Sequence, residues 1–140
     1  MKRILIAYDH TEPARRALER GAELAKAFNA EVIVTSVAPL LVGSPRAMGP
    51  VDPTDSPAHH IEELEAARGL LSEHGIDAEL LPSTGDPAGT IAMIADERDV
   101  DLVVVGTREP ALVERIMRHS VSAEVARLVH RDLLIVHPEH

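Results

Sequence analysis

The chain has 140 residues, a formal net charge of -9 and no cysteine. This length predicts a single domain over residues 1–140, with a hydrophobic core of its own. The acidic charge argues against nucleic acid and anionic membranes as partners, since both are bound by basic patches. The absence of cysteine excludes disulfides and thiolate chemistry and fits a cytoplasmic protein. No apolar stretch approaches the roughly 18 residues of a membrane span.

The first part of the chain predicts a strand, a helix and a second strand. Residues 4–8 form the short apolar run of a buried strand. Thr11 and Pro13 form a helix start, with threonine as the N-cap and proline in the first turn, and Asn29 is a suitable helix end. The β-branched residues 32–37 favour the second strand.

The same alternation continues to the end of the chain. Further helices are expected from Ser56, Asp86 and Ser120, and further strands over residues 78–81, 101–105 and 133–136. This order indicates an α/β fold with a parallel sheet covered on both faces. Right-handed crossovers make such a five-stranded sheet doubly wound, and its ligands bind beyond the carboxyl ends of the strands, at the switch point.

Residues 38–56 match neither a helix nor a strand. The segment contains four prolines and two glycines. A mobile flap near the ligand site and an ordinary disordered insertion explain this composition equally well.

Residues 103–122, VVVGTREPALVERIMRHSVS, begin as a nucleotide-binding loop does and then depart from one. The buried apolar run stops at Gly106 and Thr107, and a helix begins again near Ser120. The sequence contains none of the motifs GxxxxGK[ST], GxSxG and HExxH, so it offers no ready-made phosphate loop, nucleophile or zinc site.

Three long stretches resemble the universal stress protein family. KRILIAYDHTEPARRALERGAELA is similar to the family's first strand, acidic turn and first helix. STGDPAGTIAMIADERDVDLVVVGT is similar to its third helix and fourth strand, and HSVSAEVARLVHRDLLIVHP to its last helix and strand. The resemblance covers essentially the whole chain and implies a Rossmann-like fold of the adenine nucleotide alpha hydrolase type, with strand order 3-2-1-4-5.

The family contains ATP-binding and non-binding members, and the binding members share a loop of glycine, two residues, glycine, nine residues, glycine and Ser or Thr. Here the spacing is kept, with Gly106 at the first glycine, Glu109 and His119 at the other two, and Ser120 at the hydroxyl. Losing one charge-assisted hydrogen bond to phosphate costs about 1.5–3 kcal/mol, and the carboxylate of Glu109 adds repulsion. The resemblance therefore implies weakened binding of ATP or AMP, with or without Mg, or no binding.

The resemblance also implies where the rest of the nucleotide would lie. Asp9 matches the acidic residue near adenine and ribose, while Ala7, Tyr8 and Val37 match positions that flank the adenine. The complete candidate set is Ala7, Tyr8, Asp9, Val37, Gly106, Thr107, Arg108, His119, Ser120, Val121 and Ser122. Simpler roles are open, since Asp9 and Ser120 can cap helices and the loop arginines, Arg108 among them, can form a solvated network with Glu109.

The histidines do not favour a metal site. His59 and His60 are adjacent, so on a helix they would not share a face, and His130, His137 and His140 stand in the tail. We expect solvated histidines at these positions.

Three functional hypotheses follow. The first is a stress-linked regulatory domain with weakened adenine nucleotide binding. The second is an interaction module that binds no nucleotide and acts as a dimer. The third, a slow ATPase, ranks last because no general base, metal cage or partnered nucleophile is evident. The uncharged stretch Leu133–Val136, at a predicted sheet edge, indicates a homodimer, and family members resemble this in pairing their last strands.

Overall fold

A computed structural model of the chain describes residues 1–9, 11–38, 57–107 and 121–137. These residues form a five-stranded parallel sheet in the order β3-β2-β1-β4-β5, which confirms the predicted topology. The strands are β1 (Arg3–Ala7), β2 (Glu31–Ala38), β3 (Glu79–Thr84), β4 (Leu102–Gly106) and β5 (Asp132–Val136). Ala38 ends β2, and the rest of the predicted flap, residues 39–56, lies outside the described residues.

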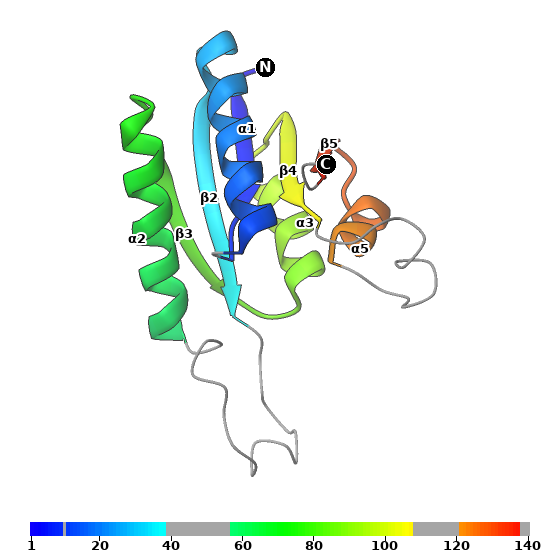
Figure 1. Cartoon of the computed structure of the whole chain (residues 1–140). Coiled ribbons are helices and arrows are strands. Elements are labelled where there is room, and N and C mark those ends of the chain that lie inside the picture. Colours follow the sequence, from blue (N-terminus) through cyan, green and yellow to red (C-terminus); the bar gives the residue numbers. More distant parts are fainter. Residues whose placement is uncertain (10, 39–56, 108–120, 138–140) are drawn as a thin grey trace.

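Helices cover both faces of the sheet (Figure 1). They are α1 (Glu12–Phe28), α2 (Pro57–Glu73), α3 (Pro87–Glu97) and α5 (Val121–Leu128). Helices α1 and α2 pack on one face, and α3 and α5 lie together on the other. Among the described residues, no helix is both long enough and apolar enough to cross a membrane.

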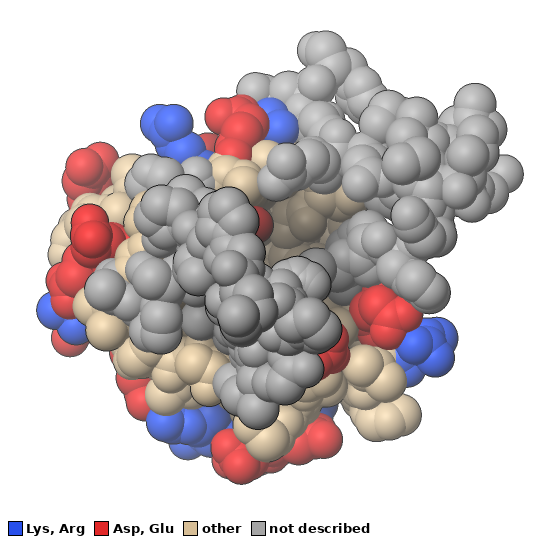
Figure 2. Space-filling view, turned by 90° about the horizontal axis from the view of Figure 1, so that it is seen from below, with Lys and Arg blue, Asp and Glu red and all other residues tan. Residues whose placement is uncertain are grey.

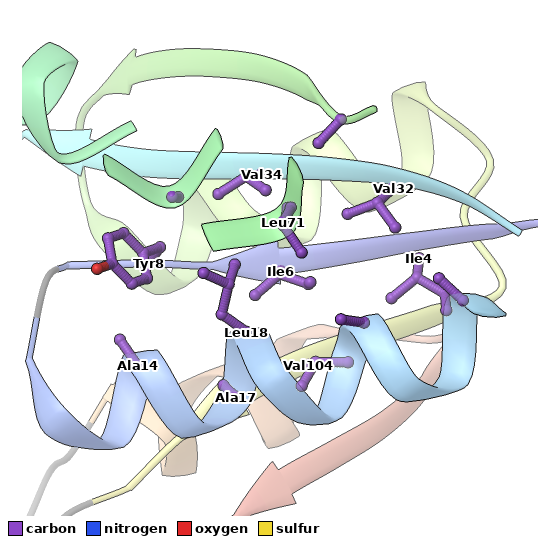
Figure 3. Close-up of a cluster of buried hydrophobic side chains, with 14 of the residues drawn as sticks. Ile4, Ile6, Tyr8, Ala14, Ala17, Leu18, Val32, Val34, Leu71 and Val104 are labelled. Atoms are coloured by element: carbon purple, nitrogen blue, oxygen red, sulfur yellow. The ribbon is translucent and has the colours of Figure 1, made fainter. Parts of the chain in front are cut away.

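Successive residues of a strand point to opposite faces of the sheet, so each face has its own layer of buried side chains. Ile4 and Ile6 point to the α1 and α2 side, while Leu5 between them points to the α3 and α5 side. All three side chains are fully buried. Figure 3 shows the first of these layers, in which Tyr8 continues the row of Ile4 and Ile6 at the carboxyl end of β1. The core therefore extends to the edge at which a ligand would bind.

The predicted ends of α1 are confirmed. The hydroxyl of Thr11 accepts a hydrogen bond from the backbone N–H of Ala14 at 3.3 Å, which is the N-cap arrangement. Asn29 closes the helix in the left-handed conformation, with φ of 54°. This fixes the start of α1 directly after the turn that leaves β1.

Candidate functional site

The carboxyl ends of β1 and β4 form the switch point of the sheet. β1 lies between β2 and β4, and the chain builds the sheet from β1 toward β3 before it crosses back to β4. In such a sheet the connections on the two sides of this point lead away from each other, which leaves a crevice for a ligand. Figure 2 views the molecule from this end and shows acidic and basic side chains around the outline of the molecule.

Four candidate residues meet at this point. Ala7 ends β1 and Gly106 ends β4, while Tyr8 and Thr107 follow them directly. The N–H of Tyr8 donates to the carbonyl oxygen of Thr35 in β2 at 2.9 Å, and the N–H of Thr107 donates to that of Val136 in β5 at 3.0 Å. The segments after β1 and β4 therefore leave the sheet at positions that hydrogen bonds to the neighbouring strands fix. Val37, near the end of β2, is half-buried on the face toward α3.

Gly106 is held at this position by packing. A Cβ atom placed on it would lie 2.3 Å from the backbone oxygen of Pro13 and 2.5 Å from its carbonyl carbon. The first turn of α1 thus lies directly against the end of β4, and only glycine leaves room for it. Gly106, which the sequence predicts in a phosphate loop, therefore also allows the close contact between α1 and β4.

Asp9 stands in the turn between β1 and α1. Its Oδ1 atom accepts hydrogen bonds from the backbone N–H of Thr11 at 3.1 Å and from the Thr11 hydroxyl at 2.5 Å. Because Thr11 is itself the N-cap, Asp9 holds the cap in place and does not cap α1 directly. Among the described residues, nothing donates to its Oδ2 atom. The exposed carboxylate therefore organises the turn through one of its two oxygens.

The phosphate half of the predicted site is not described. Arg108, His119 and Ser120 lie outside the described residues, as does Glu109. Val121 and Ser122 form the start of α5, and only their backbone is described. Their roles remain predictions from the sequence.

A groove of about 480 Å³ runs between α1 and α2 beside Tyr8. It is lined by Tyr8, Thr11, Glu12, Arg15, Ala66, Gly69, Leu70 and Glu73. Burial raises the pKa of the Tyr8 phenol above its ordinary value, and the nearby Glu63 carboxylate raises it further. Arg15 opposes these effects, whereas Asp9 adds to them. Tyr8 therefore stays a neutral hydroxyl at physiological pH.

One polar cluster was not predicted. Ser36 in β2 and His60 and Glu63 in α2 are buried and bonded to one another. The expectation of a solvated histidine is wrong for His60, because α2 turns its side chain onto the sheet, where Ser36 lies. The spacing of His60 and Glu63, one turn apart on a helix, was the available signal. The serine that completes the cluster could not be found from helix spacing.

Of the other histidines, His59 is half-buried, and its Nε2 atom lies 3.7 Å from Oε2 of Glu63. His130 and His137 are exposed, and His140 lies outside the described residues. Within the described part of the chain, no group of three or more His, Cys, Asp or Glu side chains is placed to hold a metal ion.

The fold is a doubly wound α/β domain with its switch point between β1 and β4. The family model of the universal stress protein family matches residues 1–137. Universal stress protein Sll1654 of Synechocystis is 32% identical over 135 residues, which cover 96% of this chain and 85% of that protein. Universal stress protein YxiE of Bacillus subtilis is 30% identical, over 96% of this chain and 97% of that protein. The chain belongs to the universal stress protein family, whose members are stress-response domains.

Solved structures agree with this assignment. A universal stress protein in complex with cAMP has a TM-score of 0.78 and 28% sequence identity, and the match covers 99% of this chain and 98% of that chain. The Archaeoglobus fulgidus universal stress protein in complex with dAMP has a TM-score of 0.73 at 23% identity, covering 97% of this chain and 98% of that chain. The second likeness shows the fold alone.

Proposed function

We propose that this stress-response domain binds an adenine nucleotide, ATP or AMP, at the carboxyl ends of β1, β2 and β4. The observation that carries the proposal is the turn after β1, where Asp9 keeps an exposed carboxylate oxygen next to the switch point. A ribose hydroxyl or the adenine amine would donate to that oxygen. Tyr8 and Val37 would flank the base. The cAMP complex of a relative at 28% identity supports an adenine ligand.

The nucleotide phosphates would extend from Gly106 toward the start of α5. The N-terminus of a helix carries unpaired N–H groups and a positive dipole end, which suit an anion. With ATP, a Mg ion would accompany the phosphates. Nucleotide that stays with the protein through mild purification, and is identified after extraction, would support this function. Protein that carries none, and takes up none from millimolar ATP, would contradict it.

Glu109 stands where binding members of the family have the second loop glycine, and restoring that glycine should tighten nucleotide binding. Glu109→Gly should remove a negative charge from the predicted phosphate loop and restore a residue with free backbone conformation. We expect the affinity for ATP to rise by at least about tenfold and the affinity for adenosine to stay near that of the parent. Equal ATP affinities for parent and variant would show that Glu109 does not face the phosphates.

A homodimer through β5 is the second part of the proposal. β5 is an edge strand, and Leu133, Leu134 and Ile135 are only half-buried in the single chain. An uncharged apolar edge is usually paired or covered. We expect Ile135→Lys to convert a dimer to a monomer in light scattering. Met93→Lys is the control, because Met93 is an apolar side chain that is 52% exposed and belongs to α3, not to β5. A monomeric parent would contradict the dimer.

We also propose that the domain acts in the cytoplasm, which the absence of cysteine supports. Cell fractionation tests this. If nucleotide binding fails while the dimer is found, the protein is an interaction module.

A further inference from the structure

Three buried polar side chains join β2 to the start of α2. Ser36 is 0% exposed, and His60 and Glu63 are each 6% exposed. The Ser36 hydroxyl donates to Oε1 of Glu63 at 2.9 Å, and Nδ1 of His60 lies 2.9 Å from the same oxygen. Nδ1 also contacts the Ser36 hydroxyl oxygen. The three groups thus form a closed ring of polar contacts inside the protein.

The Glu63 carboxylate is the acceptor in this ring. Ser36 has one hydroxyl proton, which it donates to Glu63. In the tautomer with its proton on Nδ1, His60 donates to the oxygens of Ser36 and Glu63. The Glu63 carboxylate accepts from both partners, and its other oxygen lies 3.7 Å from Nε2 of His59. Nε2 of His60 is buried and has no hydrogen-bond partner among the described residues, so Nδ1 and the oxygens of Ser36 and Glu63 alone hold the ring in one arrangement.

This ring adjoins the candidate nucleotide site. Ala7 pairs with Thr35 across β1 and β2, and the Tyr8 N–H donates to Thr35, so Tyr8 and Ser36 are the next residues of two paired strands. Both side chains face α2, since Tyr8 packs with Leu64 in the same core layer and Ser36 bonds to Glu63. Val37 follows Ser36 directly. Fixing Ser36 therefore fixes Tyr8 and Val37, two of the three residues that would flank the adenine.

We propose that His60 and Glu63 are positioning residues, which act through Ser36 to hold the carboxyl ends of β1 and β2, with Tyr8, against the start of α2. The role in ligand binding rests on the proposed nucleotide function, whereas the role in holding Tyr8 does not. The simpler alternative is that the ring only attaches α2 to the sheet.

Tyr8 provides a reporter of the Glu63 charge beside it. It is the only tyrosine, and the chain has no tryptophan, so the near-ultraviolet absorbance of tyrosinate reports Tyr8 alone. Rapid pH-jump titration reads this ionisation before the protein unfolds. Because the Glu63 carboxylate raises the pKa of Tyr8, we expect Glu63→Gln to lower it. Glu73→Gln is the matched control, since Glu73 lies on the same helix and lines the groove beside Tyr8.

Hydrogen exchange tests whether Ser36 holds the carboxyl ends of β1 and β2 in place. Ser36→Ala should raise exchange at the amides of Tyr8 and Val37 by at least about tenfold relative to the parent. The amide of Thr107, which is bonded to Val136 in β5, should keep its parent rate. A uniform increase at all three amides would mean that Ser36 contributes only to global stability, and it would overturn the proposal.

The nucleotide measurement is kept separate. We expect Glu63→Gln to weaken binding of adenosine and ATP, but not of tripolyphosphate, relative to Glu73→Gln. If the parent binds no nucleotide while exchange in Ser36→Ala rises at the amides of Tyr8 and Val37 but not at Thr107, the proposed function fails and the positioning role stands. If Ser36→Ala leaves exchange at the amides of Tyr8 and Val37 at the parent rates, the positioning role is wrong, whatever the parent binds.

Discussion

Replacing Gly106 with alanine is expected to destabilise the domain by about 1–3 kcal/mol, the usual cost of adding a methyl group to a full core. The new Cβ atom would lie 2.3 Å from the backbone oxygen of Pro13, far inside contact distance. Backbone cannot rotate aside as a side chain can, so the start of α1 must move away from β4. Chemical denaturation with an unchanged m-value would measure the loss.

Gly69→Ala is the matched control for this prediction. A Cβ atom on Gly69 meets nothing within 4 Å, and the residue lies exposed inside α2. The same chemical change there should stabilise the protein by up to about 1 kcal/mol, because alanine loses less backbone entropy in a helix. If both variants shift stability in the same direction, the close approach of Pro13 to Gly106 does not determine the outcome.

Replacing Asp9 with alanine is expected to weaken binding of adenosine and ATP by roughly ten- to a hundredfold, the effect of losing one charge-assisted hydrogen bond. Tripolyphosphate should bind as it does to the parent, since Asp9 is predicted to contact the adenine and ribose end. Calorimetric titration of the variant with each ligand measures the difference.

The Asp9→Asn variant separates ligand contact from local structure. Its amide oxygen can still accept from the N–H and hydroxyl of Thr11, as Oδ1 of Asp9 does. We expect its unfolding free energy to be near that of the parent and its adenosine affinity to lie between those of parent and alanine variant. If the adenosine affinities of the parent, Asp9→Asn and Asp9→Ala change only in step with their unfolding free energies, Asp9 only organises the start of α1.

The fold was predictable because its signals are local. Thr11 and Asp86 each precede a proline, and both cap helices in the structure. Asn29 closes α1 as expected. The strand β3 is longer than the predicted residues 78–81 and reaches Thr84, because its pairing with β2 continues to Ala38. That extension comes from the neighbouring strand and has no signature in the sequence of β3.

The site was predictable only in part, since its contacts join distant segments. The predicted ends of the first and fourth strands placed Tyr8 and Gly106 at the switch point. Their expected roles came from the resemblance to the universal stress protein family. The contact of Gly106 with Pro13 depends on how closely α1 approaches β4. The bonds from Ser36 to His60 and Glu63 depend on the rotation of α2 about its axis. Neither quantity follows from spacing along one element.

Calorimetric titration of the parent protein with ATP, ADP and AMP tests the central claim most directly. We expect saturable binding with one nucleotide per chain, of lower affinity than three loop glycines would give, and competition by adenosine. The absence of heat and of competition at millimolar concentrations of all three nucleotides would contradict nucleotide binding, and the domain would then be an interaction module.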